Sequence, residues 1–331
     1  MKTKFPGKKP AAKKKPIVFS KAYDIGVKGM EKLHPFDMRK YSNVFNELVK
    51  RGLIERGQEM TPAKISDKDL SSVHTAEYLK KLDDKEQLAR IFEVPLLAQM
   101  PAFLTKSLVL NPMLHQAGGS VTAGEAALKD GWAINLGGGF HHAAADQGHG
   151  FCAIADITLA VRKLREGHPE IKKVMIIDLD AHQGDGHERD FKNDKDVYIL
   201  DMYNQDVFPN DAEGRKRANI NGGIPSNTQD KEYLETLKDA LDRAKAEFRP
   251  DVIFYVAGSD ILAGDPLGVL SVSKEGVIKR DEMVFEYALG NKIPVAMLFG
   301  GGYQPSNAGI IADSIENLNK KFGLLKGPKG P

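Results

Sequence analysis

The chain has 331 residues and is poor in three features that mark particular classes of protein: cysteine, long apolar runs and net charge. Its single cysteine excludes an internal disulfide, which favours a reducing compartment. No apolar run approaches the ~20 residues of a membrane span, and no secretory leader is recognised. A formal net charge of +2 gives no overall case for binding nucleic acid or a membrane surface. We therefore expect a protein of the cytoplasm, or of the nucleus and cytoplasm in a eukaryote.

Hydrophobic residues are plentiful, at 41%, and the interior of the chain contains no linker, so we predict one catalytic domain over residues 17–323. Residues 1–16 are rich in lysine and proline and are predicted to form a disordered basic tail. A nuclear-import or polyanion-binding arm is one interpretation of this tail, and a plain solvated tail is the one we favour. Residues 324–331 are predicted to be a second, flexible tail.

Strands and helices alternate from residue 131 onward. Short apolar runs predict strands at 132–136, 174–178, 197–201, 251–256 and 294–299. Amphipathic segments predict helices at 155–166, 231–248, 274–289 and 308–320. The earlier part predicts an edge strand at 17–19, helices at 37–51, 66–82 (one or two) and 120–128, and nothing definite over 84–118. Such alternation predicts an α/β fold with a mostly parallel sheet covered by helices on both faces.

Acidic side chains and a histidine follow the predicted strand at 174–178. Asp180 and His182 are two positions apart, so in extended chain they leave the same face, and Asp178 shares this parity. One carboxylate oxygen and one imidazole nitrogen on one face are half of a catalytic zinc site. The carboxyl ends of strands are where open α/β sheets bind ligands. The alternative, a surface turn rich in Asp and Gly, would lie between polar segments instead of after an apolar strand.

Asp260, which follows the predicted strand at 251–256, is the natural third ligand. Two Asp oxygens and one His nitrogen leave a fourth position open for water, as in catalytic zinc sites. Taken alone, Asp260 is equally typical of a helix cap. Cys152 is the other soft donor in this region, and we interpret it as a packing residue.

Two adjacent histidines, His141 and His142, follow the strand at 132–136. We expect their rings to point apart and to need separate partners, for which Asp178 and Asp185 are available. A reference pKa of about 6.5 suits histidine to act as a base toward water and as an acid toward a leaving amine. An isolated pair of histidines would more often be structural.

Tyr303 follows three glycines after the last predicted strand. Its phenol would stabilise an oxyanion from the side that a metal leaves uncovered. On this string alone an ordinary half-buried tyrosine is the simpler interpretation. The triple glycines also lack the spacing of phosphate-binding loops.

These residues lie in long motifs that resemble the metal-dependent histone deacetylase superfamily. The motifs are GGGFHHAAADQGHGFC, IIDLDAHQGDGHERDF, AGSDILAGDPLG and FGGGY. Four strings resemble the class IV branch more narrowly: ADITLAV, LDAHQGDGHERDF, VYILDMYN and LSVSKEGVIKRDE. The resemblance covers roughly residues 17–320 and is strongest from 131 onward. It implies a single-domain arginase–deacetylase fold with the active site at the carboxyl ends of the strands.

The resemblance also implies roles for individual residues, because the family hydrolyses acylated lysine with one zinc and a tyrosine. The implied zinc ligands are Asp180, His182 and Asp260. The implied catalytic residues are His142 as general base oriented by Asp185, His141 paired with Asp178, and the carbonyl-polarising Tyr303. The implied tunnel residues are Gly150, Phe151, Phe208 and Leu267.

A monovalent cation such as K⁺ is a further expectation from the resemblance. Its implied ligands are Asp178 and the main-chain carbonyls of Asp180, His182, Asp201 and Met202. Asp201 departs from the serine that other branches often carry, which changes the local charge.

The leading functional hypothesis is zinc-dependent hydrolysis of the amide of Nε-acyl-lysine in proteins. Class IV resemblance implies that long fatty acyl groups are removed better than acetyl. The alternatives are an amidohydrolase for small acetylated amines such as acetylpolyamines, and a non-catalytic scaffold that binds acyl-lysine. An arginase-type ureohydrolase would need two metals and more carboxylates. We expect acylated proteins or peptides as partners and no direct binding of nucleic acid.

Overall fold

Seven parallel strands form the central sheet of the computed structural model, which describes residues 13–25 and 39–325 of the chain. In sheet order the strands are β1 (Ile17–Val18), β2 (Trp132–Asn135), β7 (Val295–Leu298), β6 (Val252–Val256), β3 (Val174–Asp178), β4 (Val197–Asn204) and β5 (Ile220–Ile224). Each neighbouring pair is parallel. The predicted mostly parallel sheet is therefore confirmed.

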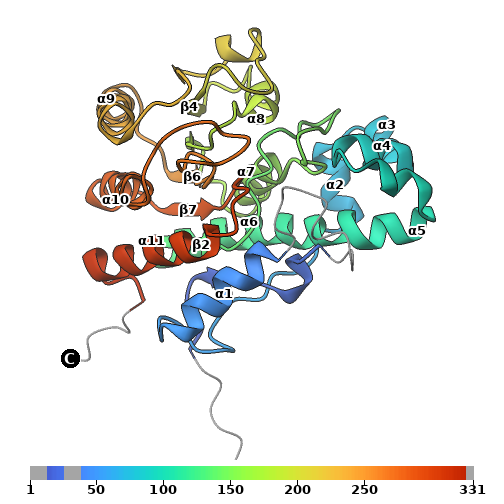
Figure 1. Cartoon of the computed structure of the whole chain (residues 1–331), viewed down its shortest axis with the longest axis horizontal. Helices are drawn as coiled ribbons and strands as arrows, with labels where there is room; N and C mark the ends of the chain where they lie inside the picture. Colours follow the sequence, from blue (N-terminus) through green and yellow to red (C-terminus); the bar gives the residue numbers. More distant parts are fainter. Residues whose placement is uncertain (1–12, 26–38, 326–331) are drawn as a thin grey trace, which may run out of the picture.

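Helices cover both faces of the sheet because successive side chains of each strand point to opposite sides. Met175 and Ile177 of β3 pack in a cluster with residues of α1 (Lys40–Lys50), α9 (Asp230–Glu247), α10 (Lys274–Gly290) and α11 (Asn307–Phe322). Val174 and Ile176 pack in a second cluster with α6 (Asn111–Asp130) and α7 (Asp156–Gly167). Figure 1 shows α9 and α10 on one side of the strands and α7 on the other.

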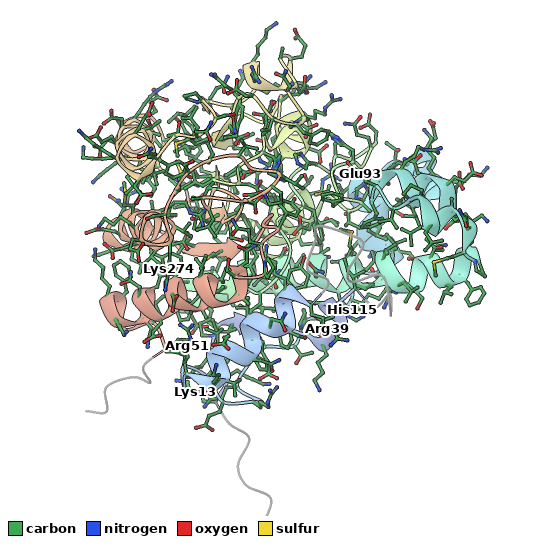
Figure 2. The ribbon with its side chains drawn as sticks, in the orientation of Figure 1. Lys13, Arg39, Arg51, Glu93, His115 and Lys274 are labelled. Carbon is green, nitrogen blue, oxygen red and sulfur yellow. The ribbon has the colours of Figure 1, made fainter. Side chains whose placement is uncertain are left out.

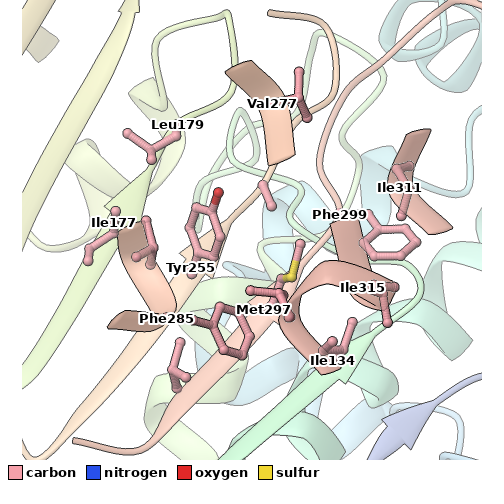
Figure 3. Close-up of a cluster of buried hydrophobic side chains, with 14 of the residues drawn as sticks. Ile134, Ile177, Leu179, Tyr255, Val277, Phe285, Met297, Phe299, Ile311 and Ile315 are labelled. Carbon is pink, nitrogen blue, oxygen red and sulfur yellow. The ribbon is translucent and has the colours of Figure 1, made fainter. Parts of the chain in front are cut away.

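The larger of the two clusters is built from aromatic and branched side chains. Figure 3 shows Tyr255 and Met297 of the sheet against Phe285 of α10 and Ile315 of α11. Each of these residues is at most 2% exposed, so the strands beneath the site have little freedom to move.

A separate group of short helices lies at the right of Figure 1. It consists of α2 (Asp67–Val73), α3 (Ala76–Lys81), α4 (Lys85–Ile91), η2 (Pro95–Gln99), α5 (Ala102–Thr105) and the π-helix η3 (Lys106–Leu110). Their apolar sides form one cluster with the start of α6 and with the loop over residues 140–155. Residues of this group form one wall of an apolar cavity.

The structure adds several elements to the prediction. The helix expected at 120–128 begins at Asn111, and the uninterpreted segment 84–118 is helical over most of its length. β5 has the sequence INGGI, which lacks an apolar run, so periodicity could not find it. The remaining short helices are η1 (Lys21–Tyr23), α8 (Asp185–Asp190) and η4 (Gly214–Lys216).

Charged side chains tie the outer helices together. Figure 2 labels Arg51, which directly follows α1, and Lys274 of α10. Both pair with Asp313 of α11, with Arg51 Nη1 2.6 Å from Asp313 Oδ1. No helix in the described part of the chain has the length and apolarity to cross a bilayer.

The predicted tails at 1–16 and 324–331 lie mostly outside the described residues, so those boundaries stay predictions.

Candidate active site

Asp180, His182 and Asp260 meet at the carboxyl ends of β3 and β6, which are neighbours in the sheet. His182 Nδ1 lies 3.1 Å from Asp180 Oδ1 and 3.1 Å from Asp260 Oδ2. One ligand atom from each residue lies within 4.8 Å of the others, and all three side chains are buried. Two carboxylates and an imidazole in this arrangement can hold a metal ion.

The carboxylates of Asp180 and Asp260 lie close together and are stabilised by a positive charge between them. Burial and the neighbouring Asp180 raise the pKa of Asp260 to about 6. Burial lowers the pKa of His182, but its bonds to the two carboxylates outweigh that effect and raise it to about 10. In the metal-free protein a proton on His182 therefore offsets the carboxylates, and a metal ion would replace that proton.

The glycines before Tyr303 allow the backbone to approach the cluster. Gly301 N–H donates to Asp180 Oδ2 at 2.6 Å. A Cβ at Gly301 would lie 2.2 Å from Asp260 Oδ2, so any other residue would displace that carboxylate. The buried Lys40 of α1 donates to the carbonyls of Gly300 and Gly301, which holds this loop from the opposite side.

The two adjacent histidines have separate carboxylate partners. His141 Nδ1 lies 2.9 Å from Asp178 Oδ2, and His142 Nδ1 lies 2.9 Å from Asp185 Oδ1. The expectation that the rings point apart is wrong, because their centroids are 4.1 Å apart. Gly138 and Gly139, with φ of 72° and 77°, turn the chain so that both rings face the crevice.

The two histidines have opposite protonation preferences. Burial and the adjacent His141 lower the pKa of His142 to about 3. Burial also acts to lower the pKa of His141, but Asp178 and Asp180 outweigh it and raise that pKa to about 9. One neutral imidazole beside one imidazolium is the pairing that a base and an acid require.

Tyr303 completes the group of polar side chains. Its ring centroid lies 6.2 Å from that of His182 and 5.9 Å from that of Phe151. Burial, with the carboxylates of Asp260 and Asp180, raises the pKa of the phenol well above its ordinary value. The phenol therefore stays protonated and can donate a hydrogen bond.

An apolar cavity lies beside these polar side chains. The volume open to the centre of a water molecule is about 60 Å³. Its polar end is formed by His141, His142 and Tyr303. Its apolar walls include Phe92, Val94, Leu97, Val109, Met113 and Phe151.

The four predicted tunnel residues occupy different places. Gly150 and Phe151 line the cavity, both with left-handed backbone. Phe208 is 46% exposed, and its ring centroid lies 5.1 Å from that of His142, at the outer edge of the site. Leu267 is partly buried and is not among the described residues that line the cavity.

A second buried group that can hold a cation consists of Asp178, His187 and Asp201. His187 Nε2 lies 2.8 Å from Asp178 Oδ2, and Asp201 Oδ2 accepts from Gly184 N–H at 2.8 Å. Asp201 Oδ1 is buried with no hydrogen-bond donor among the residues described. Burial, Asp178 and Glu188 raise the pKa of Asp201 well above its ordinary value. Met202, another implied ligand of the monovalent cation, directly follows Asp201 in β4.

The sequence did not indicate a role for four residues that lie near the site. They are His149, His187, Lys40 and Arg280. His149 Nε2 lies 2.9 Å from Asp185 Oδ2. Arg280 of α10 is buried and donates to the carbonyls of Leu179 and Gly258, in the two loops that carry Asp180 and Asp260. A charged residue on the apolar face of the helix predicted at 274–289 was a signal that could have indicated Arg280.

Comparisons with known proteins show the family of this chain. The family model described as "Histone deacetylase domain" matches residues 34–318. The chain is 46% identical to Histone deacetylase 2 of Arabidopsis thaliana over 314 residues, which are 94% of this chain and 80% of that protein. It is 31% identical to an uncharacterized protein of Picosynechococcus over 94% of this chain and 96% of the relative.

Two solved structures share the fold at low sequence identity. The HDA15 HD domain superposes with a TM-score of 0.72 and 21% identity, covering 96% of this chain and 91% of the other. An acetylpolyamine aminohydrolase from Burkholderia pseudomallei superposes with a TM-score of 0.71 and 18% identity, covering 92% of this chain and 98% of the other. The two solved structures show the arginase–deacetylase fold. The family model and the 46% identical relative show that the chain belongs to the histone deacetylase family.

Proposed function

We propose that the protein is a zinc-dependent hydrolase of Nε-acyl-lysine in proteins or peptides. The observation that carries this proposal is the meeting of the Asp180–His182–Asp260 cluster with two His–Asp pairs at one end of an apolar cavity. The name of the Arabidopsis relative, a histone deacetylase, supports the same substrate class. A scaffold that only bound acyl-lysine would have no use for these polar groups.

Zinc is the metal that this donor set favours. Two carboxylate oxygens and one imidazole nitrogen, with a fourth position open, are typical of catalytic zinc. When bound, zinc would polarise both the attacking water and the acyl carbonyl. For the second buried group we propose a monovalent cation, because Asp178 offers it a carboxylate oxygen and Asp201 Oδ1 is buried there without a hydrogen-bond partner among the described residues. The remaining ligands that the resemblance implies are the main-chain carbonyls of Asp180, His182, Asp201 and Met202.

The chain's own residues would move the protons. His142 would take a proton from the attacking water, while Asp185 holds its Nδ1–H. His141, paired with Asp178, would give a proton to the leaving amine of lysine. The protonated phenol of Tyr303 would donate to the carbonyl oxygen as it gains negative charge.

The acyl group would enter the apolar cavity, which is lined in part by side chains of η2, η3 and α6. Each methylene of the acyl chain that is buried there would stabilise binding by about 0.8 kcal/mol. We propose that long acyl groups are therefore preferred, as in the class IV branch that the sequence resembles.

A panel of acyl-lysine peptides from acetyl to myristoyl tests this function. We expect zinc-dependent turnover that chelator abolishes and that rises with chain length. Met113→Trp, which adds bulk at the cavity wall, should reduce turnover of long chains far more than of acetyl. Faster turnover of an acetylated polyamine than of every peptide would instead favour the small-amine alternative.

Tyr303→Phe removes one hydroxyl and preserves the ring, so packing against Phe151 should hardly change. Because the hydrogen bond strengthens as the carbonyl oxygen gains charge, we expect kcat to fall by about 10²–10³, the scale of one oxyanion donor. KM should change far less. Steady-state kinetics on one peptide measure both constants. A large rise in KM with unchanged kcat would mean that Tyr303 only binds substrate.

A further inference from the structure

Asp185 has a histidine on each of its two carboxylate oxygens. Oδ1 faces His142 Nδ1 at 2.9 Å, and Oδ2 faces His149 Nε2 at 2.9 Å. Arg189 Nε lies farther from Oδ2, at 3.8 Å. The carboxylate is 1% exposed, whereas the side chain of His149 is 31% exposed. His149 therefore connects a buried carboxylate, paired with the proposed base, to the outer edge of the site.

We propose that His149 is a positioning residue for His142, acting through Asp185. The inference rests on the proposed role of His142 as the base. A carboxylate held at one oxygen only can rotate about its Cβ–Cγ bond, whereas the His149 bond at Oδ2 keeps Oδ1 directed at His142 Nδ1. That contact keeps the proton of His142 on Nδ1 and leaves Nε2 as the proton acceptor.

The competing explanation is that His149 serves only to pack against other rings at the outer edge of the site. The ring of His149 lies 5.4 Å from that of Phe208 and 5.5 Å from that of His142, measured between centroids. Gly150 comes next in the chain, and a Cβ there would lie 2.9 Å from Phe208 Cε1. In that case His149 would only support Phe208 as a wall for the substrate, and its hydrogen bond to Asp185 would have no kinetic effect.

Two substitutions separate the explanations. His149→Gln retains an N–H donor for Asp185 and loses the ring, whereas His149→Phe retains a ring and loses the donor. We expect His149→Phe to lower kcat about tenfold, the scale of one hydrogen bond to a charged group, with KM changed less than about twofold. His149→Gln should recover most of kcat. Wild-type kcat in His149→Phe, together with a raised KM in His149→Gln, would overturn the proposal.

A measurement independent of turnover uses the ring proton on His142 Nδ1, identified in proton NMR spectra by its loss in His142→Ala. We expect this signal to shift and exchange faster with water in His149→Phe, but not in His149→Gln. Arg189→Gln, on the same side of Asp185, is the control and should leave the signal unchanged. An unchanged signal in His149→Phe would refute the positioning role. Failure of the wild-type protein to hydrolyse any acyl-lysine peptide would refute the proposed function instead, and the NMR result would still decide the role of His149.

Discussion

Asp180→Ala is expected to abolish hydrolysis of acyl-lysine peptides. The substitution removes one of three donors and leaves His182 facing Asp260 alone. Because the proposed zinc would supply several kcal/mol of transition-state stabilisation, its loss should lower the rate at least about 10³-fold. Metal content, zinc affinity by chelator competition, and kcat should all fall together.

The fold should survive this change, because the strands beneath Asp180 are held by the apolar clusters on both faces. Asp180 also accepts hydrogen bonds from the N–H groups of His182, at Oδ1, and Gly301, at Oδ2, so Asp180→Asn serves as a second variant that keeps one of the two acceptor oxygens. Asp242→Ala, on the exposed side of α9, is the matched control. An Asp180→Ala protein with wild-type zinc affinity and turnover would disprove the ligand assignment.

His142→Ala is expected to lower kcat by about 10²–10⁴, the usual effect of losing a positioned general base. The ring is buried and its pKa is lowered to about 3 by burial and His141, so it is neutral and able to accept a proton at neutral pH. Zinc affinity should change little, because His142 is outside the three-residue metal cluster. Kinetics on an acyl-lysine peptide, at saturating zinc, measure the loss.

His168→Ala is the matched control for this substitution. His168 is partly exposed and pairs with Glu125, so its loss should leave kcat unchanged. If His142→Ala retained near-full kcat while the control behaved as expected, the base would have to be another group. The neighbouring His141 would then be the first candidate to substitute.

The local pattern was sufficient to predict most elements from residue 131 onward, because buried parallel strands are continuous apolar runs and their covering helices are amphipathic. It was not sufficient for β5 or for the helices over 84–110. β5 contains two glycines, and the short helices present apolar residues to one another and to the cavity, so neither shows a clear period.

The sequence by itself also determined which side chains share a face. Asp180 and His182 are two positions apart just after β3, and this spacing predicted that they lie together. Asp178, the last residue of β3, lies instead in the second group with His187 and Asp201. The spacing could not determine which carboxylate meets which histidine. His141 lies 37 residues from Asp178, and His142 lies 43 residues from Asp185.

The family resemblance implied those pairings, and the tertiary structure gives their physical reason. The sheet places β2, β7, β6 and β3 side by side, although β2 and β7 lie at opposite ends of the α/β region in the chain. That order brings the histidines after β2, the tyrosine after β7 and the carboxylates after β6 and β3 to one edge. The role proposed for His149 could not be predicted from its neighbours in the chain, because it depends on a contact with Asp185, 36 residues away.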